Sequence, residues 1–221
     1  MKNAYVLDLA GVICDFDMNT VKGYFTQQEK DNLFTDRKST DQVIAQAAEA
    51  EFEGVLEKGI LTGEILYTPT KDVREGVLAL QNSGEIVVYS NGTTIPLLQR
   101  ILSETGIYQP GTIILPGREF GDKAKVESHQ KVFEFLSGEG YTPRMFVDDQ
   151  EPLVVACAQA AYKCGKEIAG LLGVVMGQDH EHIREAEQSN IVRIPNWNDL
   201  VERRRNGTLL DMTKMFGDRD F

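Results

Sequence analysis

Five polar residues of this chain have side chains that can carry out phosphoryl transfer if they meet. Asp8, Ser90 and Lys123 stand singly, and Asp148 and Asp149 form a pair. An aspartate can attack phosphorus and form an acyl phosphate, while further carboxylates can hold Mg²⁺, which prefers oxygen ligands. A hydroxyl and an ammonium can neutralise the group in transfer. Each residue alone has an ordinary explanation as a turn, a helix cap or a solvated side chain, so the prediction rests on the combination.

The pattern of apolar residues predicts the elements that must position these side chains. Apolar runs alternate with amphipathic stretches, which is typical of an α/β fold with a Rossmann-like parallel sheet and helices on both faces. Asp8, Ser90 and the acidic pair come at or just after strand ends, whereas Lys123 precedes a helix. Because ligands bind at the carboxyl ends of parallel strands, we expect these residues to meet at one edge of the sheet. The predicted strands are residues 4–9, 85–89, 112–115, 144–147, 172–175 and 191–194, and the predicted helices are residues 71–81, 94–103, 125–136, 152–162 and 198–205.

Residues 16–68 interrupt this alternation. The segment is polar, charged and helix-prone, and no part of it resembles a core parallel strand. It follows the first predicted strand, at the edge where ligands bind in open parallel sheets. We therefore predict a core domain of residues 1–15 and 69–221, with a small helical cap of residues 16–68 inserted after the first strand.

The order of the motifs resembles the haloacid dehalogenase-like (HAD) superfamily, whose members are mostly Mg²⁺-dependent phosphatases. The family's first motif, Asp-x-Asp-Gly-Thr/Val, corresponds to residues 8–12, and its second, an apolar strand that ends in Ser or Thr, to residues 87–92. Its lysine before a helix corresponds to Lys123, with Lys125 as the second choice, and its acidic pair to residues 148–149. The resemblance covers nearly the whole chain, and capped members carry their insert at the same place.

The resemblance implies a role for each matching position. Asp8 would be the nucleophile and a ligand of Mg²⁺, the main-chain carbonyl of Ala10 a second ligand, and Asp149 a third, with Asp148 as a supporting or alternative ligand. Lys123 would pair with both Asp8 and the phosphate. The implied catalytic positions are Asp8, Ala10, Ser90 and Lys123, and the implied phosphate-binding positions are Gly11, Ser90, Asn91, Gly92 and Lys123.

Ala10 departs from the family pattern, because most of its phosphatases have a second aspartate there. That aspartate protonates the leaving group and later activates water, and general acid–base catalysis is worth roughly 10²–10⁴-fold. One interpretation of Ala10 is an inactivated form of the chain, in which alanine replaces the usual aspartate. A second interpretation is a resemblance to phosphonoacetaldehyde hydrolase, whose first motif has alanine at this position. A third is a catalytically dead module that binds a phosphate ligand. The phosphonate chemistry needs a Schiff-base lysine in the cap, for which the candidates are Lys22, Lys30, Lys38 and Lys58.

Two other protein classes share parts of this residue set. Receiver domains also combine acidic residues, Ser or Thr, and Lys, but their acidic pair comes first in the chain, whereas here it comes late. Dehalogenases of the same superfamily use the attacking aspartate without Mg²⁺. The pair Asp148 and Asp149 therefore favours a metal-dependent phosphatase.

Composition narrows the expected partners and compartment. The chain has 23 basic and 34 acidic residues, for a formal net charge of −11, and a field of that sign repels nucleic acid. The sequence has no apolar run of about 18 residues, so we expect no membrane span. Three cysteines do not make a disulfide framework, which indicates a cytoplasmic protein. A short helical cap fits a small phosphorylated metabolite as the partner.

Overall fold

A six-stranded sheet lies at the centre of the computed structural model, which describes residues 1–36, 39, 41–91, 94–165, 168, 170–177 and 190–207. The strand order is β5-β4-β1-β6-β7-β8, and every neighbouring pair is parallel. The chain builds one half of the sheet outward from β1 and then crosses to the other side, so the order reverses beside β1. Such a switch point is where open α/β sheets bind ligands. The strands are β1 (Lys2–Leu7), β4 (Glu85–Ser90), β5 (Ile113–Pro116), β6 (Tyr141–Asp148), β7 (Leu172–Met176) and β8 (Ile191–Ile194).

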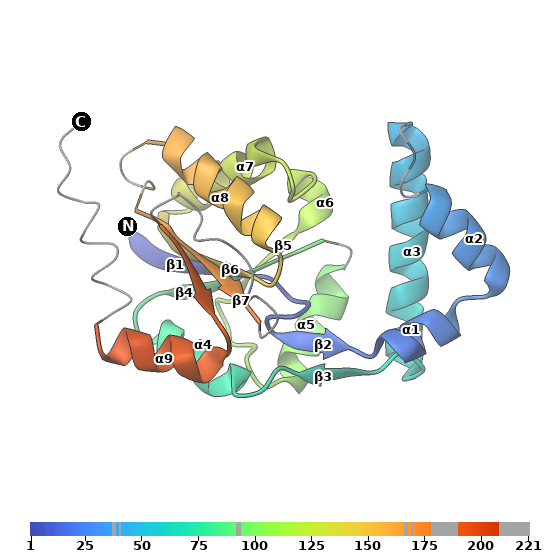
Figure 1. Cartoon of the computed structure of the whole chain (residues 1–221), viewed down its shortest axis with the longest axis horizontal. Coiled ribbons are helices and arrows are strands. Elements are labelled where there is room, and N and C mark those ends of the chain that lie inside the picture. Colours follow the sequence, from blue (N-terminus) through green and yellow to red (C-terminus); the bar gives the residue numbers. More distant parts are fainter. Residues whose placement is uncertain are drawn as a thin grey trace.

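Helices cover both faces of this sheet (Figure 1). Tyr5 and Leu7 of β1 join one apolar core, and Ala4 and Val6 join the other, because successive side chains of a strand point to opposite faces. The predicted α/β fold with a parallel sheet is confirmed. The first core contains residues of α4 (Val73–Gln81), α5 (Ile95–Glu104) and α9 (Trp197–Arg205), and the second contains residues of α6 (Gly117–Phe120), α7 (Val126–Gly138) and α8 (Glu151–Lys163).

Strand β6 begins at Tyr141, before the predicted residue 144, and so contains Pro143. The register with β1 shifts there, since Ala4 pairs with Pro143 and Tyr5 pairs with Met145. A proline has no N–H for the ladder and is found in strands mainly at edges and irregularities. The shift accommodates Pro143 and lets β6 continue as a central strand to Asp148.

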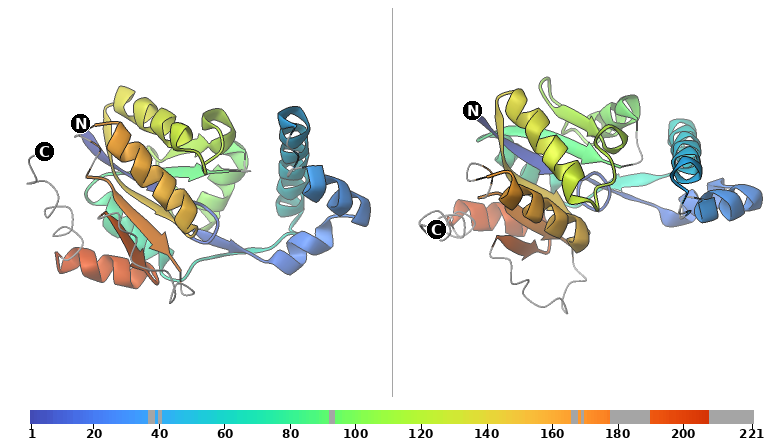
Figure 2. Two further views of the ribbon diagram at one scale, coloured as in Figure 1. Left: turned by 45° about the horizontal axis from the view of Figure 1, so that its top comes forward. Right: turned by 90° about the horizontal axis from the view of Figure 1, so that it is seen from above.

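A two-stranded antiparallel ribbon, which the sequence did not predict, connects the sheet to a group of helices (Figures 1 and 2). Its strands, β2 (Cys14–Phe16) and β3 (Tyr67–Pro69), pair with Asp15 opposite Thr68. Beyond the ribbon lie α1 (Met18–Tyr24), α2 (Gln27–Asp36) and α3 (Gln42–Thr62). We call residues 18–62 the helical segment. Its position agrees with an insert after the first strand, while its action as a cap remains a prediction.

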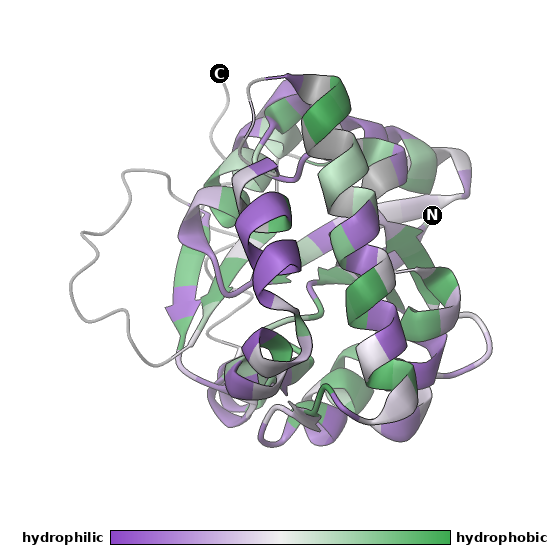
Figure 3. Cartoon of the chain, turned by 90° about the vertical axis from the view of Figure 1, so that its right-hand side faces the viewer, coloured by the Kyte–Doolittle hydropathy of each residue, from purple (hydrophilic) through white to green (hydrophobic). Residues whose placement is uncertain are grey.

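The helical segment has its own ordered ends and apolar contacts. The Asp41 carboxylate accepts the Val43 N–H at the start of α3, and Gly63 ends this helix with a φ of 77°, a conformation that favours glycine. The rings of Phe25 and Phe52 stack with their centroids 5.1 Å apart. Figure 3, in which the right-hand side of Figure 1 faces the viewer, shows hydrophilic and hydrophobic residues interleaved over the helices. Val43 of α3 is exposed.

Contacts between α3 and α5 join the helical segment to the rest of the molecule. The Thr94 hydroxyl, at the N-terminus of α5, donates to Glu57 Oε1 of α3 at 2.8 Å. Arg100 of α5 also reaches the main-chain oxygen of Leu61 at 3.5 Å. The helical segment is thus held against the helix that follows Ser90 and Asn91. In the described ranges, no helix combines the length and apolar character needed to cross a membrane.

Candidate active site

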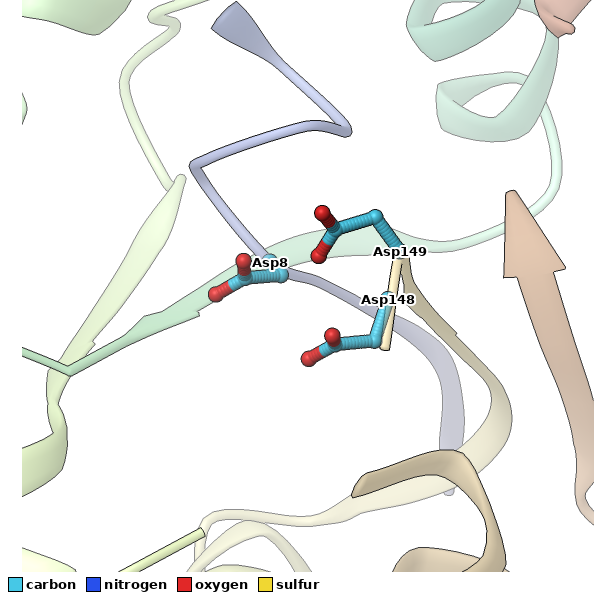
Figure 4. Close-up of side chains that lie close together, drawn as sticks. All are labelled: Asp8, Asp148 and Asp149. Atoms are coloured by element: carbon cyan, nitrogen blue, oxygen red, sulfur yellow. The ribbon is translucent and has the colours of Figure 1, made fainter. Parts of the chain in front are cut away.

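Three aspartates converge where β1 and β6 end. Asp8 directly follows β1, and its N–H donates to the Val147 oxygen of β6 at 2.8 Å. Asp148 is the last residue of β6, and Asp149 comes next. One carboxylate oxygen from each lies within 4.8 Å of the other two, and Figure 4 shows the three side chains facing a common space. The predicted meeting of Asp8 with the acidic pair is present in the structure.

Lys123 completes this cluster from the turn between α6 and α7. Its Nζ donates to Asp8 Oδ1 at 2.6 Å and to Asp148 Oδ2 at 3.0 Å. The Lys123 side chain is only 1% exposed, while Lys125 is exposed to solvent. Of the two lysines considered from the sequence, the geometry thus brings Lys123 to the carboxylates.

Burial changes the acidity of every group in the cluster. It raises the pKa of Asp8 to about 6, with Asp148 adding to the rise and Lys123 opposing it. Burial likewise raises the pKa values of Asp148 and Asp149. Burial alone would lower the pKa of the Lys123 ammonium, but the charges of Asp8 and Asp148 outweigh it and hold that pKa above its ordinary value. The ammonium therefore stays charged at neutral pH.

Asp149 offers the oxygen best placed to accept a cation. Asp148 already accepts from Lys123 through Oδ2 and from the Gln150 N–H through Oδ1, at 3.0 Å each. Asp149 Oδ1 is buried and has no hydrogen-bond partner. When all three carboxylates are ionised, the single ammonium leaves two negative charges uncompensated, and such a site is costly without a counter-ion. Oxygen donors of this kind suit a hard divalent cation such as Mg²⁺, so the residues present fit the predicted metal.

Gly11 lets the loop after β1 pass close to Asp149. Its φ is 74°, and a Cβ built on it would lie 2.5 Å from Asp149 Cγ. The loop is also held from outside the motif, because Trp197 Nε1 and the Thr70 hydroxyl both donate to the Val12 oxygen. The sequence did not predict the bond from Trp197 to this loop. Gly11 therefore leaves room for the Asp149 carboxylate because it has no side chain. This is a separate role from the phosphate contact that the resemblance implies.

We expect Gly11→Ala to lower the free energy of unfolding by about 1–3 kcal/mol. An alanine there takes up a strained φ and pushes against the Asp149 carboxylate. Urea unfolding measures the change. Gly54→Ala is the matched control, because Gly54 lies inside α3 with no atom within 4 Å of a built Cβ, and alanine there should stabilise by about 0.5–1 kcal/mol. Equal stabilities for Gly11→Ala and the parent chain would contradict the role given to this glycine.

Ser90 and Asn91 lie at the same edge of the sheet. Since Leu7 pairs with Val88, Ser90 stands one residue beyond the level of Asp8. Ser90 is buried, and its hydroxyl donates to the Asn91 oxygen at 3.2 Å. Asn91 packs so closely on Gly117 that a side chain at that glycine would meet it. Gly92, the remaining member of this predicted phosphate loop, lies outside the described residues.

Ala10 is exposed, between the buried Leu9 and the half-buried Gly11. Its methyl group can neither give nor take a proton, so the position offers no acid–base group. Because the side chain is exposed, a larger residue here displaces no core atom. The loop around it is closed by the Gly11 N–H, which donates to the Cys14 oxygen at 2.9 Å.

Comparison with known proteins gives a match at the level of structure. No family model and no curated protein matches the chain. A solved L-2-haloacid dehalogenase superposes with a TM-score of 0.61 at 14% identity, over 92% of this chain and all of that one. The chain has the haloacid dehalogenase-like fold. The HAD-like fold also appears in the L-2-haloacid dehalogenase of Xanthobacter autotrophicus (TM-score 0.59, 15% identity, 93% and 99% coverage) and in YfnB of Bacillus subtilis, assigned as a HAD-hydrolase and bound to magnesium (0.54, 16%, 91% and 97%).

The HAD-like fold confirms the resemblance found in the sequence at the level of architecture. At identities of 14–16%, these superpositions show a shared fold alone. The chemistry must be argued from the residues of the site. His129 is the buried residue beside this site whose part the sequence did not predict. Its contact with the main-chain oxygen of Lys123 depends on how α7 packs.

Proposed function

We propose that this chain is a Mg²⁺-dependent phosphatase of a small phosphorylated metabolite, which acts through an aspartyl phosphate on Asp8 and is impaired by Ala10. The observation that carries the proposal is the buried cluster in which Lys123 bridges Asp8 and Asp148 while Asp149 Oδ1 lacks a partner. This arrangement combines a nucleophile, a fixed positive charge and free oxygen donors.

Each residue has a definite part in the proposed reaction. A carboxylate oxygen of Asp8 forms a bond to phosphorus as the bond from phosphorus to the leaving oxygen breaks. The Lys123 ammonium, which lies 2.6 Å from Asp8 Oδ1, neutralises charge on the phosphoryl oxygens. Ser90 and the main chain of Asn91 hold those oxygens. When bound by Asp8, Asp149 and the Ala10 carbonyl, with Asp148 in support, Mg²⁺ supplies further charge neutralisation and orientation.

Ala10 leaves both proton transfers of this reaction unassisted. The departing oxygen must take its proton from water, and the water that attacks the aspartyl phosphate has no base at position 10. Transfer to Asp8 and the later hydrolysis are therefore both slow in this form. The chain keeps the groups that bind phosphate and the cation, which is why we propose an impaired enzyme.

Several of the solved structures with this fold are L-2-haloacid dehalogenases, so dehalogenation is the competing hydrolytic activity. The three converging carboxylates favour the phosphatase. A metal-free attack by Asp8 on a carbon atom has no evident use for the buried Asp148 and the half-buried Asp149, whose Oδ1 has no partner. Incubation with 2-chloropropionate, followed by measurement of chloride release, tests this alternative.

Ala10 itself favours a second candidate, a phosphonatase similar to phosphonoacetaldehyde hydrolase. That reaction needs a lysine of the helical segment to form a Schiff base with a carbonyl substrate. Lys22 and Lys58 are exposed, Lys30 is half-buried, and Lys38 lies outside the described residues. Borohydride trapping of phosphonoacetaldehyde on one of these lysines would support this candidate over the phosphatase.

A magnesium titration tests the proposed cation site directly. We expect Mg²⁺ to raise the Tm of the chain at pH 7.5, because a ligand that binds only the folded state stabilises it. Asp149→Asn should remove most of this rise, since it takes away a ligand charge. Asp15→Asn, at an exposed acid of the neighbouring ribbon, is the matched control and should keep the rise. An equal Mg²⁺ response in both variants would contradict the site.

The same titration has an expected pH dependence. The pKa of Asp8 in the folded chain is about 6, above its ordinary value of 3.8. The folded state without metal therefore loses stability as the pH rises through this interval, because ionisation is less favourable there than in the unfolded chain. Mg²⁺ should restore stability once Asp8 is ionised, so the Tm rise should be large at pH 7.5 and small at pH 5.

A further inference from the structure

His129 is a buried titratable residue that the proposed reaction does not use. It lies near the start of α7, is 1% exposed, and places Nε2 at 2.7 Å from the main-chain oxygen of Lys123. A carbonyl oxygen only accepts hydrogen bonds, so Nε2 must carry the proton and donate it. Burial lowers the pKa of His129 to about 4. The ring is therefore neutral at pH 7, with its single proton on the nitrogen that faces Lys123.

Two aromatic rings hold both His129 and the Lys123 ammonium. The His129 ring stands edge-on to Tyr89 and Phe146, with centroids 5.9 Å and 5.1 Å away. Lys123 Nζ lies 5.1 Å and 5.7 Å from the centroids of the same two rings, within the range of cation–π attraction. Tyr89 directly precedes Ser90 on β4, and Phe146 lies on β6 just before the acidic pair. The rings therefore belong to the strands that carry the rest of the site.

The position of the Lys123 main chain depends on contacts with residues outside its own turn. Lys123 lies between α6 and α7, so neither a helix nor a strand ladder fixes its carbonyl group. The turn that carries it is closed by the Lys125 N–H, which donates to the Asp122 oxygen at 2.9 Å. The bond from His129 ties this turn to α7. A buried carbonyl that lost this donor would be left without its hydrogen bond, and the turn would shift to find another.

We propose that His129 is a positioning residue for Lys123, because its Nε2–H holds the Lys123 carbonyl and so sets where the ammonium stands between Asp8 and Asp148. The consequence for catalysis rests on the proposed function, in which this ammonium neutralises the phosphoryl group. A displacement of about 1 Å at a catalytic group can cost about 10²-fold in rate. A histidine that only filled the core would have no such effect once its volume was kept.

Three variants separate positioning from packing. His129→Phe keeps an aromatic ring and removes the donor, while His129→Gln keeps a donor near the place of Nε2. Val132→Ala is the matched control, because Val132 lies on the same helix as His129, is 1% exposed, belongs to the core that contains Tyr89 and Phe146, and has no polar side-chain atom that could hold Lys123. Acetylation by acetic anhydride, followed by mass spectrometry, reports how well Lys123 is protected, with the exposed Lys125 as internal reference.

We expect Lys123 to resist acetylation in the parent chain, in His129→Gln and in Val132→Ala, and to react several-fold faster in His129→Phe. Unchanged protection in His129→Phe, or equal loss of protection in Val132→Ala, would overturn the proposal. If His129→Phe does not fold, ¹⁵N shifts of His129 in the parent chain decide instead. A neutral ring protonated on Nε2 supports the proposal, and one protonated on Nδ1 overturns it.

For measurements of kcat and KM, each of these variants is combined with Ala10→Asp. His129→Phe should then lower kcat by about 10–10²-fold with a smaller change in KM, His129→Gln should recover most of the loss, and Val132→Ala should keep kcat. An unchanged kcat in His129→Phe would count against the proposal. Absence of turnover in every form would contradict the phosphatase, while the acetylation result would still decide the role of His129.

Discussion

Ala10→Asp is expected to raise phosphatase turnover by about 10²–10⁴-fold, the worth of a general acid–base group. The nucleophile Asp8, the ammonium of Lys123 and the open Asp149 oxygen are already together. The missing element is a proton donor and acceptor two residues after Asp8. Since Ala10 is exposed, the new carboxylate can be accommodated without repacking the core. The measurement is kcat on a panel of small phosphate monoesters, with and without Mg²⁺.

Two controls make the result specific to proton transfer at position 10. Ala10→Asn has nearly the size of the aspartate but cannot serve as the acid or the base, so its turnover should stay near that of the parent chain. Asp8→Asn in the Ala10→Asp background should remove all turnover, because the nucleophile is gone. Phosphate binding without turnover in every variant would instead favour a catalytically dead binding module. Turnover that does not depend on Mg²⁺ would contradict the metal-dependent phosphatase.

Lys123→Met should cost about 3–5 kcal/mol of the free energy of unfolding at neutral pH, the size expected when a buried charge loses its partner. The ammonium is 1% exposed and is the counter-charge of two carboxylates, at 2.6 Å and 3.0 Å. Without it, the folded pKa values of Asp8 and Asp148 rise further above those of the unfolded chain. An acid with a raised folded pKa destabilises the fold as the pH rises, so the loss should be larger at pH 8 than at pH 5.

Urea unfolding at both pH values measures this loss. The matched control is Lys125→Met, because Lys125 is exposed two residues away and its replacement should stay within about 0.5 kcal/mol at both pH values. Mg²⁺ should restore part of the stability of Lys123→Met by compensating the same carboxylates. A loss that did not grow with pH would mean that packing, and not charge, explains the cost of the substitution.

The fold was largely predictable because buried parallel strands are strongly apolar and end at recognisable residues. The predicted strand at 191–194 coincides with β8, and the predicted start of β4 at Glu85 is correct. The predicted start of β6 at residue 144 is too late, because β6 contains Pro143 at a register shift with β1 that the sequence does not signal. The ribbon of β2 and β3 was missed because strands of three residues show no periodicity.

The parts of the site that depend on strand ends could be predicted, and the parts that depend on turns and side-chain contacts could not. Asp8, Asp148 and Asp149 could be predicted to meet because strand ends of a parallel sheet share an edge. The different surroundings of Asp148 and Asp149 could not be predicted, since they depend on which oxygen Lys123 reaches. The contact of His129 with the Lys123 carbonyl depends on the turn before α7, and such a turn leaves no periodic signal in the sequence.

The ribbon also determines how the molecule can change over evolutionary time. Phe16 and Tyr67 pair across it, so the helical segment leaves the ribbon and rejoins it at adjacent points. Everything between these points can be lengthened, shortened or exchanged without re-threading any strand of the larger sheet. A segment of different length or sequence between Phe16 and Tyr67 would therefore leave the carboxylate cluster in place.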